Sequence, residues 1–299
     1  MHAFTLPKAA ALLALVALVG LPSPGRADTF PPLNSPSTSE KHPGKFIWAE
    51  LFTTDTKAAA KFYTGIFPWT ADVIEKRGVT YTVLSNGGRP VAGIRLRVKS
   101  ASTGAARWVP FISTADVNDA LKASTKAGGV TRAPCRKFSS LGHLAIATDT
   151  DGAPFGLIES ITGDPVDDEP GPGGWNWFHL FARDPKASAE FYRAIAPYDV
   201  NPGSRKDSGT ELILSSGGFN RAGISTVPAD EGSKPGWLGV VRVANLDETL
   251  AKVPGLGGEV SVAPHDAVLG SRFAIVTDPS GGSVGLGEYI NNANPANRP

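Results

Sequence analysis

Two stretches of the sequence decide the fold: WAELFTTDTKAAAKFY at residues 48–63 and WFHLFARDPKASAEFY at residues 177–192. Nine of their sixteen positions are identical, and the second stretch begins 129 residues after the first. The same spacing recurs downstream within one residue, where Ala92-Gly93-Ile94 is matched by Ala222-Gly223-Ile224. Trp108 and Trp237 form a further matched pair. A fixed period of this kind predicts two homologous domains in tandem.

Each copy contains a smaller repeat, in which a strand is followed by a helix and then by β-rich runs. The helices are predicted to begin at residues whose side chains accept hydrogen bonds from free amides of the first turn, namely Asp55, Asp116, Asp184 and Asn245. Apolar residues at helical spacing predict the buried face of the first helix, namely Ala59, Phe62, Tyr63 and Ile66. The unit is therefore β-α-β-β-β and occurs four times, which predicts an α+β fold.

Composition divides the rest of the chain. Residues 28–43 are rich in Pro, Ser and Thr and predict a mobile leader, and residues 163–173 are acidic and rich in Pro and Gly, as in a domain linker. The predicted divisions are a signal peptide at 1–27, the leader at 28–43, a first domain at 44–162, a linker at 163–173, a second domain at 174–292 and a tail at 293–299.

The N-terminus has the features of a secretory signal. Lys8 precedes an apolar run from Ala9 to Leu21, which is shorter than the roughly 20 residues that a membrane-spanning helix needs. Small residues around Ala27 suit a signal peptidase. We expect cleavage near Ala27, export to the periplasm or the cell exterior, and no membrane attachment afterwards. The alternative is an uncleaved membrane anchor.

Charge and cysteine content exclude several functions. The 299 residues include 29 Lys and Arg against 28 Asp and Glu, a net charge of +1 that provides no basic surface for nucleic acid. The single cysteine, Cys135, excludes a disulfide framework and a cysteine-based zinc site. The chain has 34 Gly and 25 Pro, which predicts many tight turns.

The ordered set of motifs resembles the vicinal oxygen chelate superfamily, which includes glyoxalases, bleomycin-resistance proteins and extradiol dioxygenases. The resemblance rests on the opening from Asp55 to Tyr63 and from Asp184 to Tyr192, on the Ala-Gly-Ile strands and on the closing Asp-x-x-Gly hairpins. It covers both predicted domains. It implies two modules per domain that form a curved mixed sheet around a cavity, and a divalent metal held there by His, Gln or Glu.

The positions that the resemblance assigns to metal ligands hold other residue types. On the first strands of the modules they are Trp48, Val109, Trp177 and Leu238, and on the last strands they are Gly93, Gly156, Gly223 and Gly285. Neither Gly nor these apolar side chains can bind a metal. We therefore predict no metal and no cofactor, although the resemblance keeps a divalent metal open.

Strand alternation selects the candidate site residues. Residues two positions beyond the expected ligands face the same side of the sheet, which groups Trp48, Glu50 and Arg95 in the first domain, and Trp177 and His179 in the second. The glycines are expected to leave room for a ligand ring. Glu50 and His179 are the candidates for a general base. The alternatives are structural: core tryptophans, an ion pair between Glu50 and Arg95, and a hydrogen-bonded His179.

The remaining candidates, His143, His265 and Cys135, are interpreted as structural or surface residues. Three functions stay open: an exported protein that binds a small molecule without metal, a lyase or dioxygenase that uses atypical ligands or a metal-free base, and a non-catalytic interaction module. The tandem arrangement predicts a monomer in which the two domains pack as a pseudo-dimer.

Overall fold

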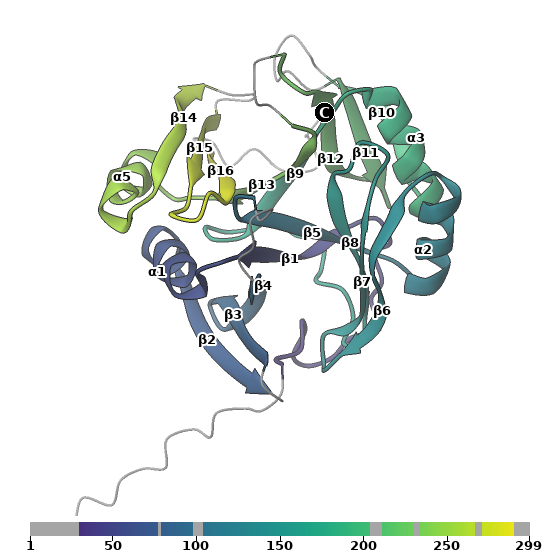
Figure 1. Cartoon of the computed structure of the whole chain (residues 1–299), viewed down its shortest axis with the longest axis horizontal. Helices are drawn as coiled ribbons and strands as arrows, with labels where there is room; N and C mark the ends of the chain where they lie inside the picture. The colour runs from purple at the N-terminus through teal and green to yellow at the C-terminus, as the bar shows by residue number, and fades with distance from the viewer. Residues whose placement is uncertain are drawn as a thin grey trace, which may run out of the picture.

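The structure is a computed structural model in which the described residues are 30–76, 79–97, 104–203, 211–229, 234–266 and 271–289. The predicted signal peptide and tail lie outside these ranges. The chain forms two eight-stranded sheets, one from each predicted domain (Figure 1). None of the helices within the described ranges is long and apolar enough to cross a membrane.

The first sheet has the strand order β2-β3-β4-β1-β5-β8-β7-β6. Its elements in chain order are β1 (Phe46–Thr53), α1 (Thr56–Ile66), β2 (Trp69–Lys76), β3 (Val79–Asn86), β4 (Arg89–Leu96), β5 (Arg107–Ser113), α2 (Val117–Lys126), β6 (Val130–Phe138), β7 (Gly142–Thr148) and β8 (Pro154–Ser160). Because β1 pairs parallel with β4 and antiparallel with β5, the sheet is mixed. Two β-α-β-β-β modules meet at β1 and β5, as predicted.

The second sheet repeats this topology in the order β10-β11-β12-β9-β13-β16-β15-β14. Its elements are β9 (Trp175–Ala182), α3 (Pro185–Ile195), β10 (Asp199–Pro202), β11 (Leu212–Ser216), β12 (Phe219–Thr226), β13 (Gly236–Arg242), α5 (Leu246–Lys252), the short 3-10 helix η1 (Pro254–Leu256), β14 (Glu259–Asp266), β15 (Ser271–Thr277) and β16 (Ser283–Tyr289). The α+β fold and the four modules are confirmed.

The helices begin where the sequence predicts. Each of the four N-cap side chains accepts a hydrogen bond from an amide of the first turn, as in the 2.9 Å bond from Ala58 N to Asp55 Oδ1. The predicted apolar face of α1 is buried. The two domains pack through these helices, with α1 beside α5 and α2 beside α3 on opposite sides of the molecule (Figure 1).

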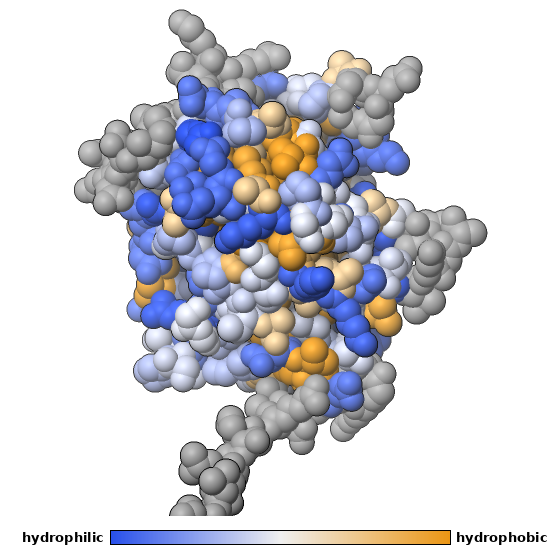
Figure 2. All heavy atoms as spheres, turned by 90° about the vertical axis from the view of Figure 1, so that its left-hand side faces the viewer, coloured by the Kyte–Doolittle hydropathy of each residue, from blue (hydrophilic) through white to orange (hydrophobic). Residues whose placement is uncertain are grey.

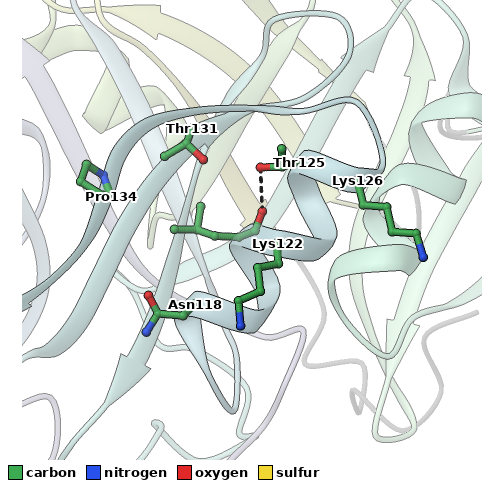
Figure 3. A pocket seen from close by; sticks show the side chains of 7 residues that line it. Asn118, Lys122, Thr125, Lys126, Thr131 and Pro134 are labelled. Carbon is green, nitrogen blue, oxygen red and sulfur yellow. Dashed lines mark hydrogen bonds between the residues drawn. The ribbon is translucent and has the colours of Figure 1, made fainter.

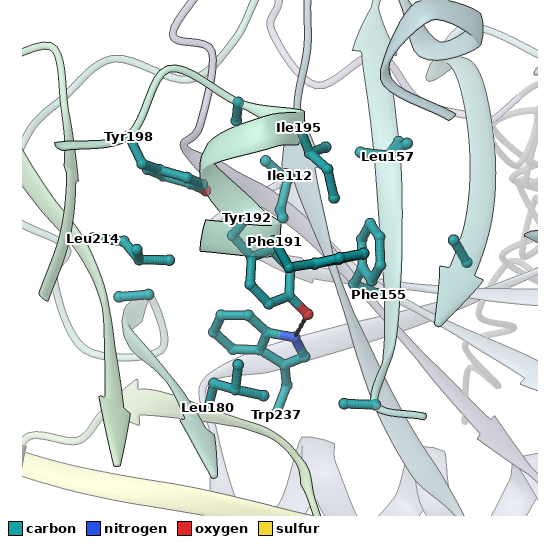
Figure 4. Close-up of a cluster of buried hydrophobic side chains, with 14 of the residues drawn as sticks. Ile112, Phe155, Leu157, Leu180, Phe191, Tyr192, Ile195, Tyr198, Leu214 and Trp237 are labelled. Atoms are coloured by element: carbon teal, nitrogen blue, oxygen red, sulfur yellow. Dashed lines mark hydrogen bonds between the residues drawn. The ribbon is translucent and has the colours of Figure 1, made fainter. Parts of the chain in front are cut away.

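The hydrophobic core crosses the domain boundary. In one cluster, Phe155 and Leu157 of the first domain pack with Leu180 and Tyr192 of the second (Figure 4). A second cluster joins α1 and its sheet to β13, α5 and β15 in the same manner. Each sheet therefore covers its helix-side apolar surface partly with its own helices and partly with the other domain.

Two equivalent groups of polar aromatic residues fasten this interface. Tyr63 Oη donates to Asp278 Oδ2 at 3.0 Å and accepts from Trp108 Nε1 at 2.9 Å. In the other domain, Tyr192 Oη donates to Asp149 at 3.1 Å and accepts from Trp237 at 2.9 Å. Each group joins a tyrosine of one domain to an aspartate hairpin of the other. The repeat thus encodes the contact between domains.

Candidate functional site

The face of each sheet that points away from its helices carries the residues predicted as a site. We call the face with Trp48 and Glu50 the first inner face, and the face with Trp177 and His179 the second inner face. The registers make them equivalent, because Glu50 pairs with Gly93 as His179 pairs with Gly223. Residues opposite one another on paired strands project to the same side. The two predicted residue sets therefore lie on two separate sheets.

Glu50, Arg95 and Tyr81 contact one another on the first inner face, and we call these three residues the closed polar group. Glu50 is fully buried, and its carboxylate lies 2.8 Å from Arg95 Nε and accepts a 2.7 Å hydrogen bond from Tyr81 Oη. Burial and the Glu50 carboxylate raise the pKa of Tyr81 well above its usual value, so the phenol keeps its proton and donates it to this bond. Glu50 Oε1 thus accepts a hydrogen bond and Oε2 makes an ionic contact without one, which agrees with the predicted ion pair between Glu50 and Arg95.

Apolar side chains fill the rest of the first inner face. Trp48 is fully buried, and Val83, Val109 and Phe111 are almost completely buried. Two residues of the predicted leader, Phe30 and Leu33, belong to the same cluster. The sequence predicts a mobile leader over residues 28–43, whereas the structure packs residues 30–34 onto the sheet and leaves residues 35–41 exposed. Phe30 and Leu33 supply apolar surface that the composition as a whole conceals.

The second inner face is only half-buried. Trp177, His179 and Phe181 alternate along β9 with the buried residues Phe178 and Leu180. His179 Nε2 is 2.9 Å from Ser225 Oγ, and the His179 ring lies 4.9 Å from that of Phe181. Burial lowers the pKa of His179 to about 4, so its imidazole is neutral at physiological pH.

Further half-buried side chains continue this face across neighbouring strands. The registers link Trp177 to Val240, Val240 to Gly285 and Gly285 to Ile275, of which Val240 and Gly285 are buried and Ile275 is half-buried. The other half-buried apolar members are Ile213, Phe273 and Tyr289. Arg242 lies over the Tyr289 ring at 5.5 Å and forms a 2.8 Å ion pair with Glu169. The described part of the second inner face thus presents aromatic and aliphatic surface around a neutral histidine.

The residues present do not fit a metal centre of the kind that the resemblance implies. Apolar side chains or glycines occupy all the expected ligand positions. Across the described ranges, no three His, Cys, Asp or Glu side chains come together in a way that would hold an ion. The side chains at these positions therefore do not supply the donors of such a metal centre.

The expected space beside the glycines is filled in the first domain. A Cβ atom added at Gly93 would lie 1.7 Å from Tyr81 Oη, and one at Gly156 would lie 2.2 Å from the Phe111 ring. At Gly285 the corresponding approach to Phe273 is 2.9 Å. The glycines of the first sheet thus accommodate aromatic side chains of the protein, and the prediction of room for a ligand ring was wrong there.

The remaining residues considered in the sequence analysis lie away from the centre of either inner face. His143 lies 3.6 Å from Glu159, and His265 contacts the Phe273 ring. Cys135 is half-buried. Sequence reasoning missed Tyr81 and Ser225, the hydrogen-bond partners of Glu50 and His179. The sequence contains a signal for both. Tyr81 is on β3, which pairs with the Ala-Gly-Ile strand β4, and Ser225 is on the Ala-Gly-Ile strand β12 itself.

The molecular surface offers two further features. A groove of about 610 Å³ lies between α2 and β6, lined by Asn118, Leu121, Lys122, Thr125, Lys126, Thr131 and Pro134 (Figure 3). It is on the helix side of the first sheet, away from both inner faces, and Lys122 is already paired with Asp119. On the side of the molecule where α1 and α5 lie, hydrophobic patches are interrupted by hydrophilic side chains (Figure 2). Neither feature gathers groups with evident chemistry.

Comparison with known proteins adds sequence and fold relationships. The profile of the Glyoxalase/Bleomycin resistance protein/Dioxygenase superfamily matches residues 174–285. The chain is 29% identical over 251 residues to "Putative glyoxylase CFP32" of Mycobacterium tuberculosis, covering 82% of this chain and 95% of the relative. It is 28% identical over 270 residues to the anthracycline biosynthesis protein DauV of Streptomyces sp. strain C5, covering 85% and 96%.

Solved structures share the fold at low identity. The Mn(II)-bound glyoxalase from Novosphingobium aromaticivorans superposes with a TM-score of 0.59 at 12% identity, covering 84% of each chain. An extradiol ring-cleaving dioxygenase from B. fuscum superposes with a TM-score of 0.58 at 13% identity, covering 88% of this chain and 76% of the other. At such identities the likeness concerns the tandem architecture alone.

Proposed function

The chain belongs to the glyoxalase/bleomycin resistance/dioxygenase superfamily, and from this premise we propose that it binds an uncharged small molecule on the second inner face without a metal ion. The observation that carries the proposal is the half-buried state of Trp177, His179 and Phe181 on β9. On the equivalent strand of the first domain, Trp48 and Glu50 are fully buried. Phe52, the counterpart of Phe181, is half-buried as well, so the two faces differ at Trp48 and Glu50 against Trp177 and His179.

The chemistry of this face favours an uncharged, largely apolar ligand. Aromatic side chains gain favourable contacts when a flat apolar molecule covers them. The His179 imidazole, with its pKa of about 4, adds a hydrogen-bonding group without charge. The nearby Arg242 is paired with Glu169 and is thus not free to attract an anion. Ser225, 2.9 Å from His179, orients the imidazole.

Binding is better supported than acid–base catalysis by the two predicted bases. Glu50 is enclosed by Tyr81 and Arg95. An imidazole whose pKa is about 4 is a weak base at neutral pH. One relative is named a putative glyoxylase and a structural neighbour is a dioxygenase, so a metal-dependent enzyme is the alternative. Metal analysis distinguishes it from metal-free binding.

The test combines metal analysis with a ligand screen of the purified full-length chain. Inductively coupled plasma mass spectrometry should find less than one equivalent of Fe, Mn, Ni and Zn per chain. A thermal-shift screen of aromatic and dicarbonyl compounds should identify stabilising ligands. We expect at least tenfold weaker binding of those ligands in Trp177→Ala and His179→Ala. The matched control, Phe219→Ala, removes an exposed aromatic residue of β12 and should bind normally.

Three outcomes contradict this proposal. A tightly retained stoichiometric metal would favour a metal-dependent enzyme with atypical ligands. Ligand binding that is unchanged in Trp177→Ala and His179→Ala would remove the second inner face from consideration. If no compound class stabilised the protein, a non-catalytic interaction module would become the better description.

We also propose that the chain is exported, on the strength of its N-terminal apolar run and the small residues around Ala27. The measurement is N-terminal sequencing of the protein recovered from outside the cytoplasm. A mature chain that begins near Asp28 is expected, and retention of Met1 on membrane-bound protein would support the anchor instead.

A further inference from the structure

We propose that residues 30–38, which we call the N-terminal strap, act as an intramolecular ligand that closes the first inner face. The strap would then close one of two faces that are equivalent in the fold. This inference does not depend on whether the second inner face binds a small molecule. It rests on three observations about the strap and the surface beneath it.

The first observation is the aromatic enclosure of Phe30. Its ring makes edge contacts with the rings of Trp48, Tyr81 and Phe138 at centroid distances of 5.5, 5.3 and 5.3 Å. Only 4% of Phe30 is exposed, and the same is true of Leu33. Edge-to-face packing of this kind is the preferred geometry for aromatic pairs. Phe30 therefore occupies the first inner face as a bound aromatic group would.

The second observation is a series of polar contacts that fix the strap backbone. Phe30 N donates to Ser139 Oγ at 3.3 Å, and Ser140 Oγ donates to the Phe30 carbonyl. Farther along, Thr38 N donates to the Thr162 carbonyl at 3.0 Å. Gly163 permits this approach, since a Cβ atom there would lie 2.0 Å from Thr38 Oγ1. The sheet thus contacts the side chains of the strap, while residues between β6 and β7 and after β8 bind its main chain.

The third observation is the polar group that the strap covers. Arg95 lies 4.7 Å from the Phe138 ring and 5.2 Å from the Tyr81 ring, while its guanidinium pairs with Glu50. Phe30 thus contacts two aromatic rings that themselves surround an ion pair. Glu50 is fully buried and the Arg95 side chain is 33% exposed, so water is kept from the carboxylate side of the pair, which strengthens its attraction. The strap and the closed polar group therefore support each other.

Among the described residues, no segment equivalent to the strap lies on the second inner face. The linker at residues 163–173 occupies the corresponding position in the chain and contains no aromatic residue. Its apolar Val166 is 52% exposed, and its Asp167 pairs with Lys45 and Arg221. The linker thus makes ionic contacts where the leader makes aromatic ones. This difference accounts for the half-buried state of the second inner face.

The strap can be tested as a ligand supplied in trans. In the full-length chain, the double variant Phe30→Ser, Leu33→Ser should release the first inner face while leaving the peptide backbone in place. A synthetic peptide of residues 28–38, DTFPPLNSPST, should then bind one per chain in isothermal titration calorimetry. The wild-type chain should bind it at least tenfold more weakly, because its own strap acts at a high effective concentration.

Two controls identify the contact that is measured. The same peptide with Phe30→Ala should bind the double variant at least tenfold more weakly than the native peptide. The variant Val166→Ser changes an exposed apolar residue of the linker and should behave as wild type. A folded double variant that does not bind the native peptide would overturn the proposal. Equal binding by the double variant and the wild type would also overturn it.

A conservative variant decides the matter if the double variant does not fold. Phe30→Leu keeps apolar volume but removes the ring contacts to Trp48, Tyr81 and Phe138. We expect the native peptide to bind Phe30→Leu at least threefold more tightly than it binds the wild-type chain. Equal affinities would show that the ring contacts do not hold the strap, and the proposal would fail. Neither result involves Trp177 or His179, so failure here is distinct from failure of the proposed function.

Discussion

The two domains are alike on their helix sides and different on their inner faces. Tyr63 and Tyr192 make the same contacts with a tryptophan and an aspartate, at distances that agree within about 0.1 Å. In contrast, Trp48 is fully buried and Trp177 is half-buried at equivalent positions of β1 and β9. The surfaces on which the domains depend for packing are thus alike. The inner faces differ, because one is largely core and the other is a candidate binding surface.

The largest expected effect comes from truncating the paired tryptophans. Trp48→Ala should lower the free energy of unfolding by about 3–5 kcal/mol, because a fully buried aromatic side chain leaves a cavity. Trp177→Ala should cost about 1–2 kcal/mol, since its side chain is partly exposed in the folded state. Denaturant unfolding of both variants measures the difference. Equal losses would mean that Trp48 and Trp177 are buried alike, which would contradict the difference between the two inner faces.

The polar groups of the two faces should differ in the same direction. Glu50→Ala should cost about 2–4 kcal/mol, because it leaves Arg95 and the Tyr81 hydroxyl without their buried partner. His179→Ala removes a neutral group with a hydroxyl partner and should cost about 1 kcal/mol. As a control, Glu190→Ala breaks an exposed pair with Arg193 and should cost at most about 1 kcal/mol. A Glu50→Ala loss no larger than this control would contradict a closed polar group.

The helix sides should respond equally. Tyr63→Phe and Tyr192→Phe each remove a hydroxyl that accepts from a tryptophan and donates to an aspartate. Each change should cost about 1–2 kcal/mol, since buried polar groups are left without a partner. Calorimetric unfolding of the two variants should give losses within about 0.5 kcal/mol of each other. Clearly unequal losses would show that the two contacts, although alike in geometry, contribute differently to the free energy of unfolding.

Repetition and capping made the architecture predictable from sequence. The 129-residue period gave the tandem arrangement, and N-cap residues such as Asp55 and Asn245 marked where helices begin. These signals are local or periodic, so a single sequence contains them. The domain interface was less accessible, because Asp149 and Asp278 resemble ordinary turn residues until the fold places them beside Tyr192 and Tyr63.

The candidate site was predictable only in part. Strand alternation correctly grouped Glu50 with Arg95, which lie on neighbouring strands. It could not distinguish the buried Trp48 from the half-buried Trp177, because both have the same sequence context. The distinction depends on Phe30, which is far from both tryptophans in the chain and lies in a segment whose composition favours disorder. A covering contact of this kind is long-range and leaves no periodic signal.

The smallest expected effect tests the environment of the second inner face through pH. His179 titrates near pH 4 in the folded chain and near 6.5 when unfolded, so between these values the unfolded state binds the extra proton. Stability should therefore fall as the pH drops from 7 to 5, by about 1 kcal/mol from this group after allowance for solvent screening.

Thermal unfolding at the two pH values should show that His179→Gln removes this part of the loss. The control His143→Gln, which changes a histidine beside Glu159, should keep it. If His179→Gln retained the full wild-type loss, the imidazole would be as well solvated in the folded chain as in the unfolded one. The second inner face would then be a wetted surface, and an apolar ligand would gain little by covering it.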